Sequence, residues 1–191
     1  IDRPGGAYQN GYYRVLPRNE QLRSLRSFGF GKTTYSQPGF QVTSVDVDGV
    51  PGDYYLSDGV LHFGSKHAPL QEGTHLIKIS YTTDSRILDE PHHDELYFGM
   101  VEDNHAGRYI RKSSATIRLP KGAEVIFTDG KAGLYQRKDF VSSVEETDSG
   151  DIAHFTLARP LKEGLDFAVN VAFIKGHVNE GSLHRIAQLD K

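Results

Sequence analysis

One short stretch of the chain concentrates ionisable side chains, "DEPHHDELYFGMVEDNHAGRYI" at residues 89–110. Imidazole and carboxylate groups are ligands that zinc and manganese accept. The candidate ligands are His92, His93, Asp94, Glu95 and His105. Their spacing opposes a metal site, because neighbouring residues of an extended strand point to opposite faces and no helical His-x-x-x-His pair occurs. We therefore predict no bound metal, and a solvated loop that enters a core strand with Leu96 and Phe98 inward.

Other chemical signals in the sequence are weaker. Residues 46–49 ("DVDG") and 147–151 ("TDSGD") are oxygen-rich, but they lack the ligand spacing of a calcium loop and Asx-type turns explain them. The segment "GFGKTTY" ends as a phosphate-binding loop does, yet Arg26 stands where the first glycine is required. No Gly-x-Ser-x-Gly motif and no cysteine is present. The sequence thus predicts no catalytic residue and no cofactor.

Two alternative functions stay open from the residues alone. A metal-assisted hydrolase would use the histidines of residues 92–105. A carbohydrate-binding domain would stack sugar rings on exposed tyrosines, although tyrosines in β-proteins more often serve cross-strand packing. The tyrosines in question are Tyr12, Tyr13, Tyr54, Tyr55 and Tyr97.

The composition excludes further classes. A net charge of -3 over 191 residues disfavours a general nucleic-acid binder, which needs a basic surplus. No window approaches the roughly 20 apolar residues of a membrane-spanning helix. The first 35 residues are locally basic, and this leader forms either a solvated edge or a surface for acidic lipid headgroups. Its basic residues are Arg3, Arg14, Arg18, Arg23, Arg26 and Lys32.

The elements that must position these residues are strands. In "LDFAVNVAF" (residues 165–173) every second residue is apolar, which is typical of a half-buried strand. Shorter alternation recurs along the chain, for example at Val125 and Phe127, and Gly-containing turn signals separate the runs. This pattern predicts an all-β fold, a sandwich of mainly antiparallel strands with little helix. We expect one domain over residues 1–178 and a tail or linker over 179–191.

Four segments occur in an order that resembles a known family. They are "GYYRVLP" (11–17), "GTHLIKISYTTDSRI" (73–87), "DELYFGMVEDNHAGRYIRKSSATIRLPKG" (94–122) and "LARPLKEGLDFAVNVAFIKGHV" (157–178). Together they resemble the extracytoplasmic domain of predicted bacterial and archaeal membrane proteins, the family called domain of unknown function 2207. The chain departs from that family by having no tryptophan after Asp-Glu-Leu-Tyr and by lacking strands expected before Gly11.

The resemblance implies a domain outside the cytoplasm that is held by membrane helices absent from this chain. It implies no catalytic residues. We expect a binding or assembly module whose contact with the membrane is through its tether only. The partner would be another protein that adds a strand to an exposed sheet edge, or the parent protein's own membrane region.

Overall fold

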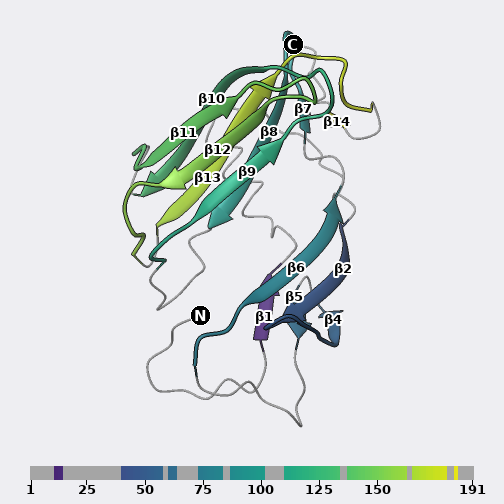
Figure 1. Cartoon of the computed structure of the whole chain (residues 1–191), viewed down its shortest axis with the longest axis vertical. Helices are drawn as coiled ribbons and strands as arrows, with labels where there is room; N and C mark the ends of the chain where they lie inside the picture. Colours follow the sequence, from purple (N-terminus) through teal and green to yellow (C-terminus); the bar gives the residue numbers. More distant parts are fainter. Residues whose placement is uncertain are drawn as a thin grey trace, which may run out of the picture. The chain divides into compact units, whose positions relative to one another are not determined.

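The computed structural model describes residues 11–14, 40–57, 60–63, 73–83, 87–101, 110–133, 137–162, 165–179 and 183–184. Within these residues every regular element is a strand and there is no helix, which confirms the all-β prediction. The chain divides into two compact units, residues 1–84 with 187–191 and residues 85–186, called unit 1 and unit 2 below (Figure 1). The single domain expected over residues 1–178 stays a prediction.

Unit 1 contains two three-stranded antiparallel sheets. The first has the order β3-β2-β6 and the second the order β1-β5-β4. Their strands are β1 (Gly11–Arg14), β2 (Phe40–Val47), β3 (Val50–Pro51), β4 (Tyr54–Ser57), β5 (Val60–Phe63) and β6 (Ile77–Thr83). A small core of four buried residues, Val42, Val45, Leu61 and Phe63, joins the two sheets.

The β2–β3 turn occupies the first oxygen-rich segment. Asp48 and Gly49 have φ angles of 54° and 81°, which suits a two-residue hairpin turn. The Asp48 carboxylate accepts a hydrogen bond from the backbone N–H of Leu76 at 2.8 Å and lies 2.7 Å from Nδ1 of His75. These hydrogen bonds, chiefly the one with His75, lower the pKa of Asp48 below its ordinary value of 3.8. The Asp48 carboxylate thus links the β2–β3 turn to His75 and Leu76, just before β6.

Unit 2 is a sandwich of a five-stranded and a three-stranded sheet, with β11, β12 and β9 lying over β10, β13 and β8 (Figure 1). The larger sheet has the order β10-β13-β8-β7-β14 and is antiparallel except between β7 and β14. Its strands are β7 (Ile87–Asp89), β8 (Asp94–Val101), β10 (Val125–Gly133), β13 (Asp166–Phe173) and β14 (Leu183–His184). The smaller sheet, of order β11-β12-β9, is formed by β9 (Ser114–Arg118), β11 (Phe140–Glu145) and β12 (Ile152–Leu157).

The core of unit 2 lies between these sheets. The alternation in β13 buries one row of side chains against the smaller sheet, namely Phe167, Val169, Val171 and Phe173. The ring of Phe140 lies 6.0 Å from that of Phe155 and 6.2 Å from that of Phe167. Leu96 and Phe98 of β8 pack against the same cluster, as predicted.

Two local predictions need adjustment. Val125 and Phe127 were expected on one face, but the β10–β13 register shifts between them. This bulge leaves Phe127 42% exposed, whereas Val125 packs against the core. Leu183 and His184, expected in a tail, pair with Ile87 and Leu88 as strand β14.

Candidate functional site

The candidate metal ligands do not come together in the described residues. His92 is exposed before β8, and His105 lies outside the described residues. Asp94 and Glu95 begin β8 and, as adjacent strand residues, face opposite sides of the sheet. Of the described candidates only His93 and Glu95 meet, with Nε2 and Oε2 3.2 Å apart. Across the described ranges no group of three or more His, Asp or Glu side chains is arranged to hold a metal ion.

Glu95 organises the outer face of the larger sheet. Its Oε1 accepts a hydrogen bond from Nδ2 of Asn170 at 2.7 Å, while Oε2 faces His93. The imidazole of His93 stands edge-on to the ring of Phe127, with centroids 5.6 Å apart. One carboxylate oxygen therefore links β8 to β13, and the other contacts the turn immediately before β8.

Asp94 faces the inner side and is 1% exposed. Lys175 lies 3.5 Å from it, too long for a good hydrogen bond but close enough for ionic attraction. The same ammonium group donates to Asp89 and to the carbonyl of Glu90. The hydrogen bond to Asp89 raises the pKa of Lys175 above its ordinary value of 10.5. This arrangement stabilises one end of the sandwich.

The tyrosines of the carbohydrate hypothesis do not form one platform on β4. Tyr54 and Tyr55 are neighbours on that strand and so point to opposite sides. The hydroxyl of Tyr54 donates to the carbonyl of Val42 at 3.1 Å, a packing role within unit 1. Tyr97 is half-buried on β8, and the side chains of Tyr12 and Tyr13 lie outside what the structure describes. Carbohydrate binding and metal-assisted hydrolysis stay predictions.

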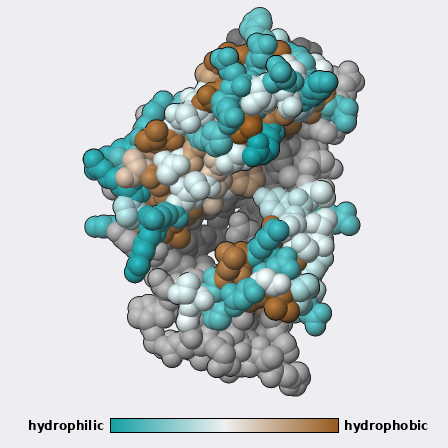
Figure 2. All heavy atoms as spheres, in the orientation of Figure 1, coloured by the Kyte–Doolittle hydropathy of each residue, from teal (hydrophilic) through white to brown (hydrophobic). Residues whose placement is uncertain are grey.

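The most distinctive surface of unit 2 is the edge formed by β11, which the sequence did not predict as a strand. β11 pairs with β12 through six consecutive residues without a register shift. On its other side no strand of the described part of the chain pairs with it. Val141 is 65% exposed and Val144 41% exposed. Figure 2 shows such hydrophobic side chains interrupting the hydrophilic surface of unit 2.

The register identifies the free backbone groups of β11. Ala158 donates its N–H to the carbonyl of Asp139 at 2.9 Å, so these two residues form a hydrogen-bonded pair. Hydrogen-bonded and non-hydrogen-bonded pairs alternate along an antiparallel ladder. The N–H and C=O groups of the odd-numbered residues therefore face β12. Those of Phe140, Ser142 and Val144 face away from it, and no described backbone group pairs with them.

The neighbouring edge strand β10 is blocked by contrast. The N–H of Gly130 is taken by the carboxylate of Asp129 at 2.8 Å, and that of Ala132 by the carbonyl of Arg137 at 2.8 Å. The bulge near Phe127 interrupts the strand further. Natural sheets use such devices against unwanted pairing. β10 is protected in this way. Among the described residues no backbone group pairs with the outer side of β11, although the hydroxyl of Ser142 lies 3.0 Å from that of Thr128 on β10.

An open acidic cleft of about 820 Å³ lies at the C-terminal end of β11. Its lining residues are Glu124, Val125, Glu145, Glu146, Thr147, Asp148 and Asp151. Asp151 is buried and accepts a hydrogen bond from the N–H of Val125 at 2.8 Å, which fixes the floor. The turn at residues 147–150 is closed by the hydroxyl of Thr147, which donates to the carbonyl of Gly150 at 2.7 Å. The second oxygen-rich segment therefore forms a turn, but a threonine hydroxyl closes it, in place of the aspartate side chain of the expected Asx-type turn.

Comparisons with protein-family models, curated proteins and solved structures found no match for this chain. Among the described residues no helix is long and apolar enough to cross a membrane.

Proposed function

We propose that this chain is the extracytoplasmic part of a membrane-anchored bacterial or archaeal protein and serves as a binding or assembly module. It takes up an extended segment of a polypeptide by strand addition along β11. The observation that carries the proposal is the free row of N–H and C=O groups on Phe140, Ser142 and Val144. Such a row gives main-chain affinity, and exposed valines beside it give side-chain contacts.

The location outside the cytoplasm and the membrane anchor are supported by the ordered sequence resemblance to the family of domain of unknown function 2207. The edge supports binding independently, because β10 is blocked and β11 is open although the two belong to neighbouring edges of one sandwich. An unprotected edge in a protein that protects its neighbour fits a surface kept for pairing.

Strand addition is tested with a probe peptide of eight alternating valine and threonine residues, N-methylated on one edge so that it cannot stack with itself. Amide hydrogen exchange is followed by NMR with and without the peptide. We expect the amides of Phe140, Ser142 and Val144 to exchange rapidly in the free protein and slowly with the peptide. Slow exchange of these amides without peptide, or no change on adding it, would overturn the proposal.

Two proline variants provide matched controls. The N–H of Val144 faces the free edge, so Val144→Pro removes one edge donor and leaves the β12 ladder intact. The N–H of Ser143 faces β12, so Ser143→Pro breaks the ladder and lowers the melting temperature. We expect Val144→Pro to fold normally and to lose peptide binding. Unchanged peptide binding in folded Val144→Pro would place the binding surface elsewhere.

The predicted location is tested separately in the full-length protein that carries this chain. Alkaline phosphatase, which is active only outside the cytoplasm, is fused behind residue 191, and β-galactosidase is fused there in a parallel strain. We expect phosphatase activity and no galactosidase activity. The reverse pattern would refute the extracytoplasmic assignment without affecting the strand-addition test.

A further inference from the structure

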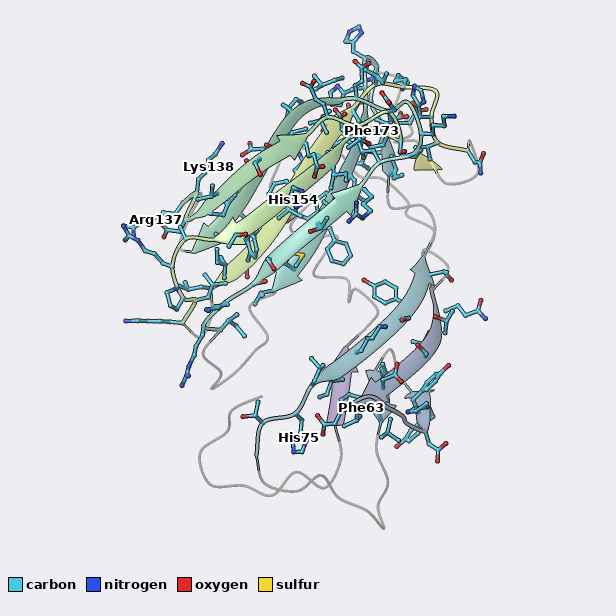
Figure 3. The ribbon with its side chains drawn as sticks, in the orientation of Figure 1. Phe63, His75, Arg137, Lys138, His154 and Phe173 are labelled. Atoms are coloured by element: carbon cyan, nitrogen blue, oxygen red, sulfur yellow. The ribbon has the colours of Figure 1, made fainter. Side chains whose placement is uncertain are left out.

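The charges beside the β11 edge are unevenly distributed between its two ends. At the start of the strand Arg137 and Lys138 project from unit 2, as Figure 3 shows, and Lys138 is already paired with Asp129 at 2.6 Å. Asp139 adds a negative charge at the same end. At the other end five carboxylates line the acidic cleft, and no Lys or Arg is among its described lining residues. The start of the edge is thus close to neutral, whereas its end is strongly negative.

Two of the five carboxylates lie where an added strand would reach them. Glu145 is the last residue of β11, and its side chain is 63% exposed on the outer face of the smaller sheet, opposite Ile152. Its Oε2 lies 3.6 Å from Nε2 of His154, too far for a good hydrogen bond. Glu146, the next residue, is exposed as well. Neither carboxylate accepts a hydrogen bond from a described residue, so both can take up a cationic side chain.

The register of an antiparallel strand on β11 follows from the outward-facing backbone groups. The N–H and C=O of Ser142 both point outward, so one central residue of the added strand exchanges two hydrogen bonds with it. Two positions earlier the added strand lies opposite Val144, and the two residues before that lie opposite Glu145 and Glu146. The residue after the central one lies opposite Val141. Each position of the added strand thus has a defined neighbour on the edge.

The side chains beside these positions determine which residues fit. Val144 lies opposite the fully buried Ala153, so its neighbour on the added strand extends the core and should be apolar. Val141, 65% exposed on the outer face, favours a second apolar residue. The hydroxyl of Ser142 lies 3.0 Å from that of Thr128 on β10, which limits the room on the inner face and favours a small central residue. This contact uses side chains and leaves the backbone groups of Ser142 for the added strand.

We propose that the segment added to β11 is basic at its N-terminal end, a proposal that rests on the proposed strand addition. The segment has two consecutive Lys or Arg residues, an apolar residue, two small polar residues and a second apolar residue, in that order. The basic pair lies opposite Glu145 and Glu146, beside the acidic cleft. Opposite charges across a strand pair stabilise it, whereas like charges destabilise it. The acidic end of the edge therefore selects a cationic polypeptide and its antiparallel direction.

The proposal is tested with short peptides that have capped ends and are N-methylated on the edge that faces away from β11. The basic peptide is Lys-Lys-Val-Thr-Ser-Val-Thr-Thr. The reversed peptide has the same residues in the opposite order, and the acidic peptide has Glu-Glu in place of Lys-Lys. Binding is followed by NMR through the amides of Phe140, Ser142 and Val144. Because each exposed ion pair changes affinity by up to about fivefold, we expect the basic peptide to bind about tenfold more tightly than the reversed peptide at low salt, and the acidic peptide to bind most weakly.

A charge-removing variant of the protein locates the effect. Glu145→Gln combined with Glu146→Gln removes both charges and keeps the size of the side chains. We expect this variant to bind the basic peptide about tenfold more weakly and to bind the uncharged valine–threonine probe as the wild type does. Asp53→Asn, at an exposed position of unit 1, is the matched control and should change neither affinity. Salt at about 1 M should abolish the advantage of the basic peptide, because the Debye length is then about 3 Å.

The outcomes separate this proposal from strand addition itself. If the valine–threonine probe protects the edge amides but the basic and acidic peptides bind equally well, the basic partner is wrong and strand addition stands. If the reversed peptide binds as tightly as the basic one, the antiparallel placement is wrong. A preference for the basic peptide that persists in the double glutamine variant overturns the assignment to Glu145 and Glu146. If no peptide affects the amides of β11, both proposals are overturned.

Discussion

Replacing Val171 by aspartate tests the assignment of the inward face of β13. Val171 is 0% exposed and belongs to the core between the sheets. Val171→Ala removes two buried methyl groups, which at about 0.8 kcal/mol each with a cavity contribution costs about 2–3 kcal/mol. Val171→Asp loses the same contacts and adds a carboxyl group without a partner.

The aspartate adds a larger penalty. A carboxyl group with a pKa near 3.9 must bind a proton at pH 7 to remain buried neutral, which costs about 4 kcal/mol at about 1.4 kcal/mol per unit. The total is about 6–7 kcal/mol, comparable with the roughly 5–15 kcal/mol that stabilises a typical domain. We expect the sandwich of unit 2 to lose cooperative folding at neutral pH.

The measurement is urea unfolding followed by far-ultraviolet circular dichroism and by tyrosine fluorescence, since the chain has ten tyrosines and no tryptophan. Val141→Asp is the matched control, because the same change at a 65% exposed position costs within about 0.5 kcal/mol. Equal unfolding midpoints for Val171→Asp and Val141→Asp would show that the burial assigned to β13 is wrong.

Three further outcomes are expected. Because the pKa of Asp48 is lowered, the stabilising contribution of its carboxylate is complete above about pH 4 and is lost as pH falls through the folded-state pKa. The difference in melting temperature between wild type and Asp48→Asn should therefore shrink on acidification. A difference that does not change from pH 2 to 6 would argue against the His75 contact. Gly150→Ala should lower the free energy of unfolding by about 3 kcal/mol or more, since the φ of Gly150 is +104° and a Cβ would lie 2.1 Å from a backbone carbonyl oxygen. Gly49→Ala, with φ +81° and open space around the Cβ, should lower it by only about 1–2 kcal/mol. Equal unfolding midpoints of the two variants in denaturant would contradict the close approach at Gly150. Lys175→Met should lower the melting temperature at pH 7. Because the pKa of Lys175 is raised above 10.5, the difference from wild type should vanish only as pH rises through the raised pKa. An unchanged melting temperature at pH 7 would show that the lysine does not contribute to stability.

Periodicity in the sequence predicted the parts of the fold that one buried face dominates. β13 alternates apolar and small or polar residues over its whole length, and β8 places Leu96 and Phe98 inward as expected. The opposite orientation of Asp94 and Glu95 also follows from strand geometry alone. The prediction of no metal site rested on the same geometry, applied to His92 and His93.

The candidate binding edge was not predictable in this way. In "FVSSVE", the sequence of β11, Val141 and Val144 lie on opposite faces and both are exposed, so no alternating row of buried apolar residues marks the strand. The bulge in β10 likewise breaks the period between Val125 and Phe127. The ion pairing of Asp94 depends on Lys175, which is distant in sequence, so no local pattern could indicate it.

The parallel pairing of β14 with β7 has a mechanical consequence. The chain passes between the two units twice, after residue 84 and after residue 186, and the strands next to both crossings lie side by side in one sheet. Unit 2 is thus an insertion within the chain of unit 1. The pairing of β14 is only two residues long, whereas the eight-residue strands β8 and β13 share a much longer ladder. Local opening of the larger sheet should therefore begin at β14, next to the crossing into unit 1, and leave the centre of the sandwich paired.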